Sequence, residues 1–436
     1  MPSVLIAGGG LVGSANACFF AQKGWSVRVF ESRPDPRGEL FEPGKSFNLA
    51  LAHRTMAALE RIGLKETVIE KGFPITKRRV YLEAQGGHLE KWPVLKDDDF
   101  VLTMNRQQLS EILINEAESY RNVEYKFNHK ALCFNFDSQN LEVDTPEGVI
   151  SVDADLILAC DGAHSSIRRS LLKVPRFNFE QTYAEYGYMD MSAKSAKGLE
   201  KGVHNLWIRD GIMLVALVNR DNSLSVSIFA KFEEFERKLS TPEVSVPFFK
   251  RNFPEIVAIL GEKHVSEMFV RNKPQAIISV KCSQHAFFDK LLLMGDAAHA
   301  LVPFTGHGAN CGFEDCLVLQ EILEKNDGMS IEKSVREYSE VRTEDTNAMN
   351  RMAWKAHLTL DRTVYKVPVS WTEKFMSLLR SAADRLLTHP SLLATHSRVP
   401  YAEIERKAKF SDNLPRHILA VILIVFALLS LVFSAI

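Results

Sequence analysis

The sequence predicts an α/β fold of interleaved domains, followed by C-terminal helices and one C-terminal transmembrane helix. Three observations support this prediction: a strand, a glycine-rich turn and a helix open the chain, two later apolar strands each end beside an acid–glycine pair, and residues 418–436 carry no charge. With 436 residues the chain is too long for one ordinary hydrophobic core, so two or three structural units are expected.

The composition is that of a folded protein that does not bind nucleic acid. Hydrophobic residues make up 46% of the chain and charged residues 25%, and the net charge is −1. These values are typical of a globular protein and indicate no basic surface for a phosphate backbone. The six cysteines form no CxxC pair, so we expect buried apolar residues rather than disulfides or ligands of a metal.

The first strand, over residues 4–7, leads into a turn with GxGxxG spacing. Gly8 allows the tight turn, Gly10 lets the backbone approach a pyrophosphate, and Gly13 lets the following helix pack closely on the strand. A second strand ends at Glu31, whose carboxylate can accept hydrogen bonds from a ribose diol and would repel a 2′-phosphate. The segment therefore predicts a Rossmann-like dinucleotide site, where the N-terminus of the helix favours the phosphates.

Two later segments repeat the order of apolar strand, acid–glycine pair and helix. The strand over residues 156–159 is followed, after one cysteine, by Asp161-Gly162, and the run LLLM is followed by Gly295-Asp296. Taken singly, such a pair is more often a plain turn than a site. Their order after the GxGxxG turn makes the functional interpretation the stronger one.

In this order and at these separations, the three motifs resemble the FAD-dependent flavoprotein aromatic hydroxylases. The resemblance implies that the first motif holds the ADP half of FAD, that Asp161 supports it from the side, and that Asp296 binds the ribityl hydroxyls. The loop over residues 303–310 would lie along the isoalloxazine ring. The backbone N–H groups of Ala309 and Asn310 would then stabilise negative charge on the reduced flavin.

The resemblance also implies the cofactors and further contacts to them. FAD is the expected cofactor, and NADPH is expected as a transient co-substrate because the chain has one GxGxxG turn, as this family does. The remaining residues that the resemblance places against the flavin nucleotide are Leu11, Val12, Ala50, Arg106, Ala131, Ser166, Pro303 and Gly308.

Within that family the chain is similar to the kynurenine hydroxylases. The segments FNLALAHRTMAALERIGL over 47–64, FEEFE over 232–236 and GFEDC over 312–316 carry this similarity. It implies hydroxylation of L-kynurenine to 3-hydroxykynurenine in tryptophan catabolism, with O2 as the oxygen source and a C4a-hydroperoxyflavin as the oxygen donor. Two alternatives stay open: hydroxylation of a different aromatic acid, and a catalytically impaired paralogue that binds flavin.

The same resemblance implies a substrate site without a catalytic side chain, because the flavin carries the oxidation. The implied substrate contacts are Arg78, Asn350, Tyr401, Trp92 and Phe304. Arg78 can bind a carboxylate bidentately, although with Arg79 beside it an ordinary solvated strand pair is the alternative. Trp92 stands where the family has a tyrosine, and residues 350–354 also depart from the family, so the substrate is left open.

The motifs divide the chain into interleaved domains. The predicted boundaries are 1–70, 101–175 and 283–340 for the FAD-binding domain, 71–100 and 176–282 for a substrate domain built mainly on a β-sheet, 341–410 for a C-terminal helical region, and 418–436 for a transmembrane tail anchor. The expected partners are a small aromatic amino acid, O2 and a lipid bilayer. No oligomeric state is predicted.

Residues 418–436 are predicted to anchor the chain in a membrane. At about 1.5 Å per residue this apolar stretch is roughly 28 Å long, which matches the hydrocarbon core of a bilayer. Arg406, Lys407, Lys409 and Arg416 precede it, and the positive-inside rule then keeps the body of the protein in the cytosol. The resemblance implies the outer mitochondrial membrane, and a buried core helix is the alternative.

Overall fold

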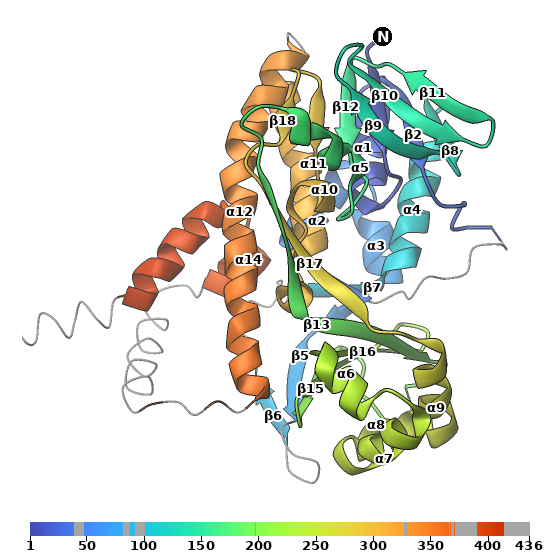
Figure 1. Cartoon of the computed structure of the whole chain (residues 1–436), viewed down its shortest axis with the longest axis vertical. Coiled ribbons are helices and arrows are strands. Elements are labelled where there is room, and N and C mark those ends of the chain that lie inside the picture. The colour runs from blue at the N-terminus through green and yellow to red at the C-terminus, as the bar shows by residue number, and fades with distance from the viewer. Residues whose placement is uncertain are drawn as a thin grey trace, which may run out of the picture.

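Two β-sheets and one long helix organise the chain (Figure 1). The computed structural model describes residues 1–38, 48–81, 88–91, 101–196, 198–326, 330–365, 367, 370 and 390–413. The first sheet lies in the upper part of Figure 1 and the second in the lower part, and helix α12 (Ile331–Val364) runs beside both. The α/β class predicted from the sequence is confirmed.

The first sheet has six strands in the order β18-β19-β12-β1-β2-β8. Neighbouring strands are parallel, except that β18 and β19 are antiparallel. The central strands are short and buried on both faces, which explains why they appear in the sequence as unbroken apolar runs. The strands are β1 (Ser3–Ala7), β2 (Ser26–Glu31), β8 (Val123–Phe127), β12 (Leu156–Ala159), β18 (Ala286–Phe287) and β19 (Leu291–Leu293).

A different layer covers each face of this sheet. Val4 and Ile6 of β1 belong to a core shared with helices, whereas Leu5 and Ala7 belong to a core shared with a three-stranded sheet. The helices are α1 (Leu11–Gln22), α2 (His53–Arg61), α3 (Lys65–Lys71), α4 (Arg106–Glu118) and α11 (Gly308–Lys325). The small sheet, with α5 (Ser166–Ser170) and η1 (Leu171–Lys173) beside it, comprises β9 (Lys130–Asn135), β10 (Asn140–Thr145) and β11 (Gly148–Val152).

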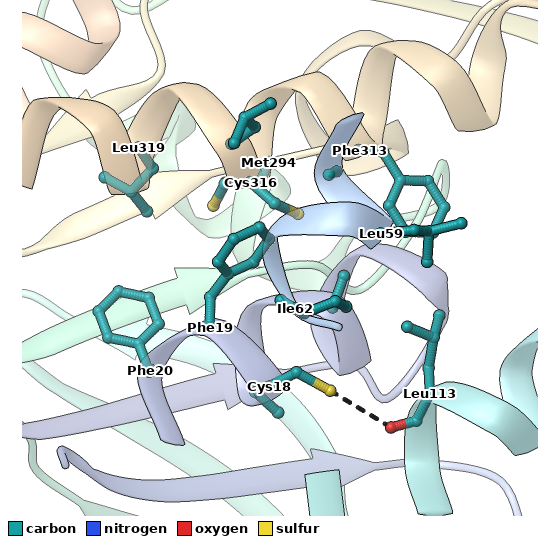
Figure 2. Close-up of a cluster of buried hydrophobic side chains, with 14 of the residues drawn as sticks. Cys18, Phe19, Phe20, Leu59, Ile62, Leu113, Met294, Phe313, Cys316 and Leu319 are labelled. Carbon is teal, nitrogen blue, oxygen red and sulfur yellow. Dashed lines mark hydrogen bonds between the residues drawn. The ribbon is translucent and has the colours of Figure 1, made fainter. Parts of the chain in front are cut away.

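The helix-side core is closely packed. Figure 2 shows Phe19 of α1 among side chains from α2, α4 and α11, and the Cys18 thiol donates a hydrogen bond to the backbone carbonyl of Leu113 at 3.5 Å. Burial raises the pKa of Cys18 far above its usual value, so this thiol behaves as an apolar residue. All six cysteines are free, as predicted, although Cys133 and Cys160 are half-buried rather than buried.

The second sheet has seven strands in the order β17-β13-β16-β15-β14-β5-β6. Trp207 and Leu214 on one face pack against Phe249 in a core shared with helices. Those helices are α6 (Phe232–Lys238), α7 (Pro242–Asn252), α8 (Pro254–Leu260) and α9 (Glu262–Arg271). The strands are β5 (Lys77–Tyr81), β6 (His88–Lys91), β13 (Phe179–Ala193), β14 (Val203–Arg209), β15 (Ile212–Val218), β16 (Leu224–Lys231) and β17 (Gln275–Cys282).

The remaining elements connect the two sheets. A further three-stranded sheet has the strand order β3-β7-β4 and comprises β3 (Asn48–Leu51), β4 (Phe73–Ile75) and β7 (Val101–Asn105). Short helices α10 (Asp296–His299) and η2 (Pro303–Thr305) lead into α11. Helix α12 contacts both β17 and η2, and α14 (Pro390–His396) and a helix over 401–413 follow.

The predicted tail anchor, residues 418–436, lies outside the described residues. Within the described part of the chain, the structure contains no helix with the length and apolar character needed to cross a bilayer. The domain boundaries stay predictions.

Candidate functional site

The glycine turn after β1 is shaped by close backbone contacts on one side and open space on the other. Gly8 has φ +99°, and a Cβ there would lie 2.4 Å from the carbonyl oxygen of Cys160. A Cβ at Gly13 would lie 1.9 Å from the carbonyl oxygen of Gly8, whereas a Cβ at Gly10 would meet no protein atom within 4 Å. Because α1 begins here with no side-chain cap, its first N–H groups face a space that suits a pyrophosphate.

The first turn of α1 also touches the Gly-Asp motif. A Cβ at Gly295 would lie 2.9 Å from Cγ2 of Val12, and a Cβ at Gly312 would lie 2.5 Å from the same atom. Leu11, the first residue of α1, is half-buried. The structure therefore brings the first and third motifs together through Val12.

Glu31 ends β2 next to this turn. Its Oε2 accepts a hydrogen bond from the backbone N–H of Gly9 at 2.8 Å, and its Oε1 accepts one from Nε of Arg33 at 2.8 Å. Burial raises the pKa of Glu31, but Arg33 and the Gly9 N–H together hold it below its usual value. The carboxylate is therefore ionised and able to accept ribose hydroxyls. Arg33 is not among the residues predicted from the sequence, although the E-x-R spacing at the end of the strand is a signal for it.

Asp161 follows β12 and caps α5. Its Oδ2 accepts hydrogen bonds from the backbone N–H groups of Ser166 at 2.8 Å and Ile167 at 3.3 Å. Its Oδ1 is buried without a hydrogen-bond partner among the described residues, and burial raises the pKa of this carboxyl. An oxygen in that state fits a donor supplied by a bound nucleotide. Ala131 lies in the core below the first sheet, and its cofactor contact stays a prediction.

Asp296 is an exposed residue in an otherwise buried stretch. It begins α10, while Gly295 before it and Ala297 after it are buried. The buried Arg168 holds α10 beside the Asp-Gly segment, because its Nη1 donates to the carbonyl of Ala297 at 2.7 Å and its Nη2 to the carbonyl of Ala163 at 2.6 Å. Arg168 thus positions two of the three motifs, a role that the sequence did not indicate.

The Asn310 side chain fastens the loop after η2. Its Oδ1 accepts hydrogen bonds from the N–H of Ala52 and the hydroxyl of Thr55, both at 2.7 Å. Its Nδ2 donates to the carbonyls of Ala50 at 2.8 Å and Gly306 at 2.9 Å. Three of these bonds connect Asn310 to β3 and α2, and the fourth closes the loop on itself, so the backbone N–H of Asn310, rather than its amide, is the group left for a cofactor.

The first turn of α11 has the donors that an anionic ring edge requires. The helix begins at Gly308, and its first intrahelical bond runs from the N–H of Cys311 to the carbonyl of His307 at 2.8 Å. The N–H groups of Gly308 and Ala309 therefore belong to the part of a helix that has no intrahelical acceptor. Pro303, at the start of η2, is exposed beside them.

Strand β3 connects this loop region to the second sheet. The amide of Asn48 donates to Oδ1 of Asn219, and Ser225 of β16 donates to Oδ1 of Asn48 at 3.3 Å. Arg106 begins α4 directly after Asn105, which pairs with Asn48 across β3 and β7. Arg106 is exposed at this edge, where the resemblance places it against the flavin.

A buried charge network lies behind the loop. Oδ2 of Asp315 accepts hydrogen bonds from His299 at 2.6 Å and from the N–H of Gly295 at 2.8 Å. Its Oδ1 accepts two from Arg342 of α12, at 2.7 and 2.9 Å, and Arg342 also reaches Asp345 at 2.7 Å. Burial would raise the pKa of Asp315, but these partners hold it below the usual value of an aspartate. Burial would lower the pKa of His299, but Asp315 holds it well above the usual value of a histidine.

His299, Cys311 and Asp315 have ligand atoms within 4.8 Å of one another, which is a spacing that metal sites share. The position of Arg342 argues against a metal site. Its guanidinium donates a hydrogen bond to Oδ1 of Asp315 and another to the carbonyl of Cys311 at 3.3 Å. A cation here would face a buried positive charge. The cluster is an ion-pair network.

The face of the second sheet that looks toward η2 is apolar and aromatic. Leu206 and Met213 are buried there, and Phe229 and Phe304 are half-buried against them. The ring centroids of Phe304 and Phe229 lie 5.5 Å apart, and Phe304 stacks on His357 of α12 at 4.7 Å. Helix η2 and this sheet face therefore meet through Phe304.

Arg78 lies on the same face of the sheet, on β5, between β14 and the edge strand β6. Pairing places Arg78 opposite His204 of β14 and Val80 opposite Leu206, and Val80 packs in the apolar cluster. Two residues along a strand span about 6.6 Å, so Arg78 lies one side-chain row from the aromatic wall. Although its side chain reaches solvent, burial of the guanidinium lowers its pKa.

The neighbours of Arg78 on β5 have a shared acidic partner and Arg78 does not. Lys77 and Arg79 bind the two carboxylate oxygens of Glu200 at 3.2 and 3.0 Å. Within the described parts of the chain, Arg78 makes no ion pair, and its one hydrogen bond runs from Nε to Nδ1 of His204 at 3.4 Å. Arg78 is exposed and Arg79 binds Glu200, so the two arginines differ in their partners, and the substrate contact of Arg78 stays a prediction.

The other predicted substrate contacts lie elsewhere or outside the described residues. The amide of Asn350 donates to the carbonyls of Val280 at 3.0 Å and Ala300 at 3.1 Å, and accepts from Ser279 at 2.9 Å. These bonds hold α12 against β17. Trp92 lies outside the described residues.

Tyr401 is fully buried behind the loop after η2. The guanidinium carbon of Arg54 lies 3.9 Å from its ring centroid, and its hydroxyl has no hydrogen-bond partner in the described part of the chain. No hydrogen bond or ring contact among the described residues joins Tyr401 or Asn350 to Arg78. Their substrate contacts stay predictions, whereas Phe304 adjoins the wall that leads to Arg78.

The chain matches a known family and several known proteins. Residues 1–353 match the family described as FAD binding domain. The kynurenine 3-monooxygenase of Caenorhabditis elegans is 42% identical over 434 residues, which is 95% of this chain and 94% of the relative. The kynurenine 3-monooxygenase of Sus scrofa is 35% identical over 406 residues, 92% of this chain and 85% of the relative.

Solved structures share the fold. The tetrameric form of 2-methyl-3-hydroxypyridine-5-carboxylic acid oxygenase has a TM-score of 0.70 and 19% identity, and the match covers 83% of this chain and 93% of that one. PqsL of Pseudomonas aeruginosa, in complex with 2-aminobenzoylacetate, has a TM-score of 0.69 and 20% identity, with 84% and 98% covered.

Substitutions in the glycine turn should separate cofactor binding from folding. Gly10→Ala adds a Cβ that meets no protein atom within 4 Å, so we expect an intact fold with weaker binding of the nucleotide. Gly13→Ala places a Cβ 1.9 Å from a carbonyl oxygen, so we expect this variant to lose both its fold and its binding of the nucleotide. Circular dichroism and the flavin content of the purified protein check this pair. Full flavin content in Gly10→Ala would contradict the position assigned to the pyrophosphate.

His285 should make the fold sensitive to acid. Burial, then the nearby charge of His299, lowers the pKa of His285 to about 3, while Asp315 opposes and Arg342 reinforces that shift. The unfolded chain binds this proton below about pH 6.5 and the folded chain does not, so stability falls as the pH falls toward 3.

The free energy of unfolding of both proteins should fall when the pH is lowered from 7 to 5.5. We expect the fall to be about 1 kcal/mol smaller in His285→Leu than in the unsubstituted protein. Urea unfolding at the two pH values measures this difference. His164→Gln, at an exposed histidine, is the matched control. Equal acid sensitivity of His285→Leu and the unsubstituted protein would show that His285 takes up its proton in the folded protein as readily as in the unfolded chain.

Proposed function

This chain belongs to the kynurenine 3-monooxygenase family of FAD-dependent aromatic hydroxylases, and from that premise we propose that it hydroxylates L-kynurenine to 3-hydroxykynurenine. It is a flavoprotein monooxygenase, and NADPH is the usual co-substrate of this family. L-Kynurenine combines an amino-acid carboxylate with an aromatic ring. A site for it therefore needs a cation at one end and an apolar wall at the other.

One observation carries the choice of substrate: Arg78 has no acidic partner among the residues that the structure describes, and it lies one row from an aromatic wall. An arginine that has no internal carboxylate is available to an external one, which its guanidinium can bind through two parallel hydrogen bonds. Val80 and Leu206 begin the apolar wall next to Arg78, and Phe229 and Phe304 continue it toward the loop after η2. This arrangement supports an aromatic acid as the substrate.

The described residues fit FAD at the glycine turn and beside α11. The open side of Gly10, the ionised Glu31 and the unpartnered Oδ1 of Asp161 suit the ADP half, and Asp296 suits the ribityl chain. When bound, FAD supplies the activation of O2 and the transfer of one oxygen atom to the ring.

The protein residues then orient the substrate and exclude water. Arg78 fixes the carboxylate and so sets which ring carbon faces the cofactor. Phe229 and Phe304 form an apolar lining that keeps water from the reacting ring. The first N–H groups of α11 stabilise negative charge beside the loop after η2. None of these side chains needs to exchange a proton with the substrate.

A different aromatic acid is the second candidate. Trp92, in place of the family's tyrosine, and the departures over residues 350–354 favour it. Arg351, one of these departures, binds Glu405 at 2.7 Å on the helix over 401–413 rather than facing the aromatic wall.

The first test follows NADPH oxidation by the full-length, FAD-loaded protein in detergent, with and without L-kynurenine. We expect stimulated oxidation with a matching amount of 3-hydroxykynurenine and little peroxide. Unstimulated oxidation, or peroxide without product, would contradict the proposal, and stimulation by another aromatic acid would favour the second candidate.

Arg78→Met should weaken recognition of the carboxylate. We expect kcat/KM for L-kynurenine to fall about 10- to 100-fold, mainly through KM, because a hydrogen-bonded charge contact is lost. Arg79→Met is the matched control, because Arg79 lies next to Arg78 on β5 but binds Glu200, and the kinetics of this variant should change little. Equal effects of the two substitutions would contradict a specific role for Arg78.

We also propose that residues 418–436 anchor the protein in a cytosol-facing membrane, in the outer mitochondrial membrane by resemblance to the family. The apolar sequence and the basic residues before it support this. Fractionation of cells that express the chain with and without residues 418–436 tests it. We expect the full chain in the mitochondrial membrane fraction and the shortened chain in the supernatant; membrane association of both would contradict the anchor.

A further inference from the structure

We propose that His204 is a positioning residue for substrate recognition: it holds the guanidinium of Arg78 through Nε and so presents the other two nitrogens to the carboxylate of the substrate. This inference rests on the proposed function, because it concerns the same substrate site.

The backbone register places the two side chains together. His204 of β14 and Arg78 of β5 are direct partners across parallel strands, so their side chains lie on the same face of the sheet. Nε of Arg78 donates a hydrogen bond to Nδ1 of His204 at 3.4 Å. Val80 and Leu206, the next pair along the same strands and face, belong to the aromatic-lined wall.

The chemistry of this contact leaves Arg78 fully available to an anion. An internal carboxylate would hold the guanidinium but would also cancel its charge and compete with the carboxylate of a substrate. A neutral imidazole holds the guanidinium without cancelling its charge and without competing with the carboxylate of the substrate. Lys77 and Arg79 show the contrast, because both bind Glu200.

His204 is in the right protonation state for this role. Burial and the charge of Arg78 lower its pKa to about 3, so the imidazole is neutral at physiological pH. Because Nδ1 accepts from Arg78, the proton of the neutral ring lies on Nε2.

The geometry has a consequence for specificity. With Nε of Arg78 engaged, Nη1 and Nη2 have no partner in the described part of the chain, and they form a parallel pair of donors that matches the two oxygens of a carboxylate. The site should therefore discriminate by the carboxylate, and His204 should matter only for ligands that carry one.

The test compares two ligands and two substitutions in the full-length, FAD-loaded protein. The ligands are L-kynurenine and kynuramine, which has the same ring and ketone but no carboxylate. His204→Leu removes the acceptor, and His204→Asn keeps an oxygen near the position of Nδ1. The dissociation constants are measured without NADPH, from the change in flavin absorbance or fluorescence when the ligand binds, and KM and kcat are measured separately.

We expect His204→Leu to raise the dissociation constant of L-kynurenine about tenfold, as loss of one positioning hydrogen bond would, and to leave that of kynuramine unchanged. His204→Asn should restore most of the affinity. The loss should appear in KM with little change in kcat. His264→Leu, at a histidine of α9 on the other side of the sheet, is the matched control, and flavin content with circular dichroism checks the fold.

Two results would overturn the proposal. Unchanged affinity for L-kynurenine in His204→Leu would show that Arg78 needs no positioning. An equal loss for both ligands would show that His204 is part of the wall. If the unsubstituted protein binds another aromatic acid and not L-kynurenine, the proposed substrate is wrong, and the same comparison with that acid and its decarboxylated analogue still decides the role of His204.

Discussion

The ion pairs of Asp315 hold together the segments from which the cofactor site is built. This one carboxylate accepts hydrogen bonds from His299 after the Gly-Asp motif, from the N–H of Gly295 within that motif, and from Arg342 of α12. All these groups are buried, so each charge depends on the others for compensation. Removing one partner of such a network costs about 3–5 kcal/mol, because an uncompensated charge remains inside the protein. The loop after η2 leads into α11, the helix that carries Asp315.

The second sheet reaches the cofactor region through two further contacts. Ser225 binds Asn48 of β3, and Phe229 packs on Phe304 of η2. One polar and one aromatic contact thus place the apolar sheet face opposite the loop that the resemblance assigns to the flavin. In the proposed function, the nucleotide binds beside the first sheet and the substrate beside the second, and these two contacts place the substrate next to the loop.

Arg78 shows why strand alternation matters for function. The run Lys77-Arg78-Arg79 has three similar cations, but successive side chains of a strand point to opposite faces. Lys77 and Arg79 share Glu200, and Arg78 turns to His204 and the aromatic wall. Which of these three cations binds an acid among the described residues depends on the position of Glu200, more than a hundred residues away in the sequence. No local sequence pattern contains that information.

The sequence by itself determined the α/β class, the glycine turn, the acid–glycine pairs and the cofactor family, because these features are local. Gly8, Gly10 and Gly13 act through backbone geometry within a few residues of one another, and Glu31 follows at the end of the next strand. Only the tertiary structure decided the roles of Arg168, Asn350 and His204. Each of them acts through a partner on a distant segment: Ala297 for Arg168, Val280 for Asn350, and Arg78 for His204. Such contacts depend on how the sheets and α12 pack, and packing between distant segments leaves no periodic signal along the chain.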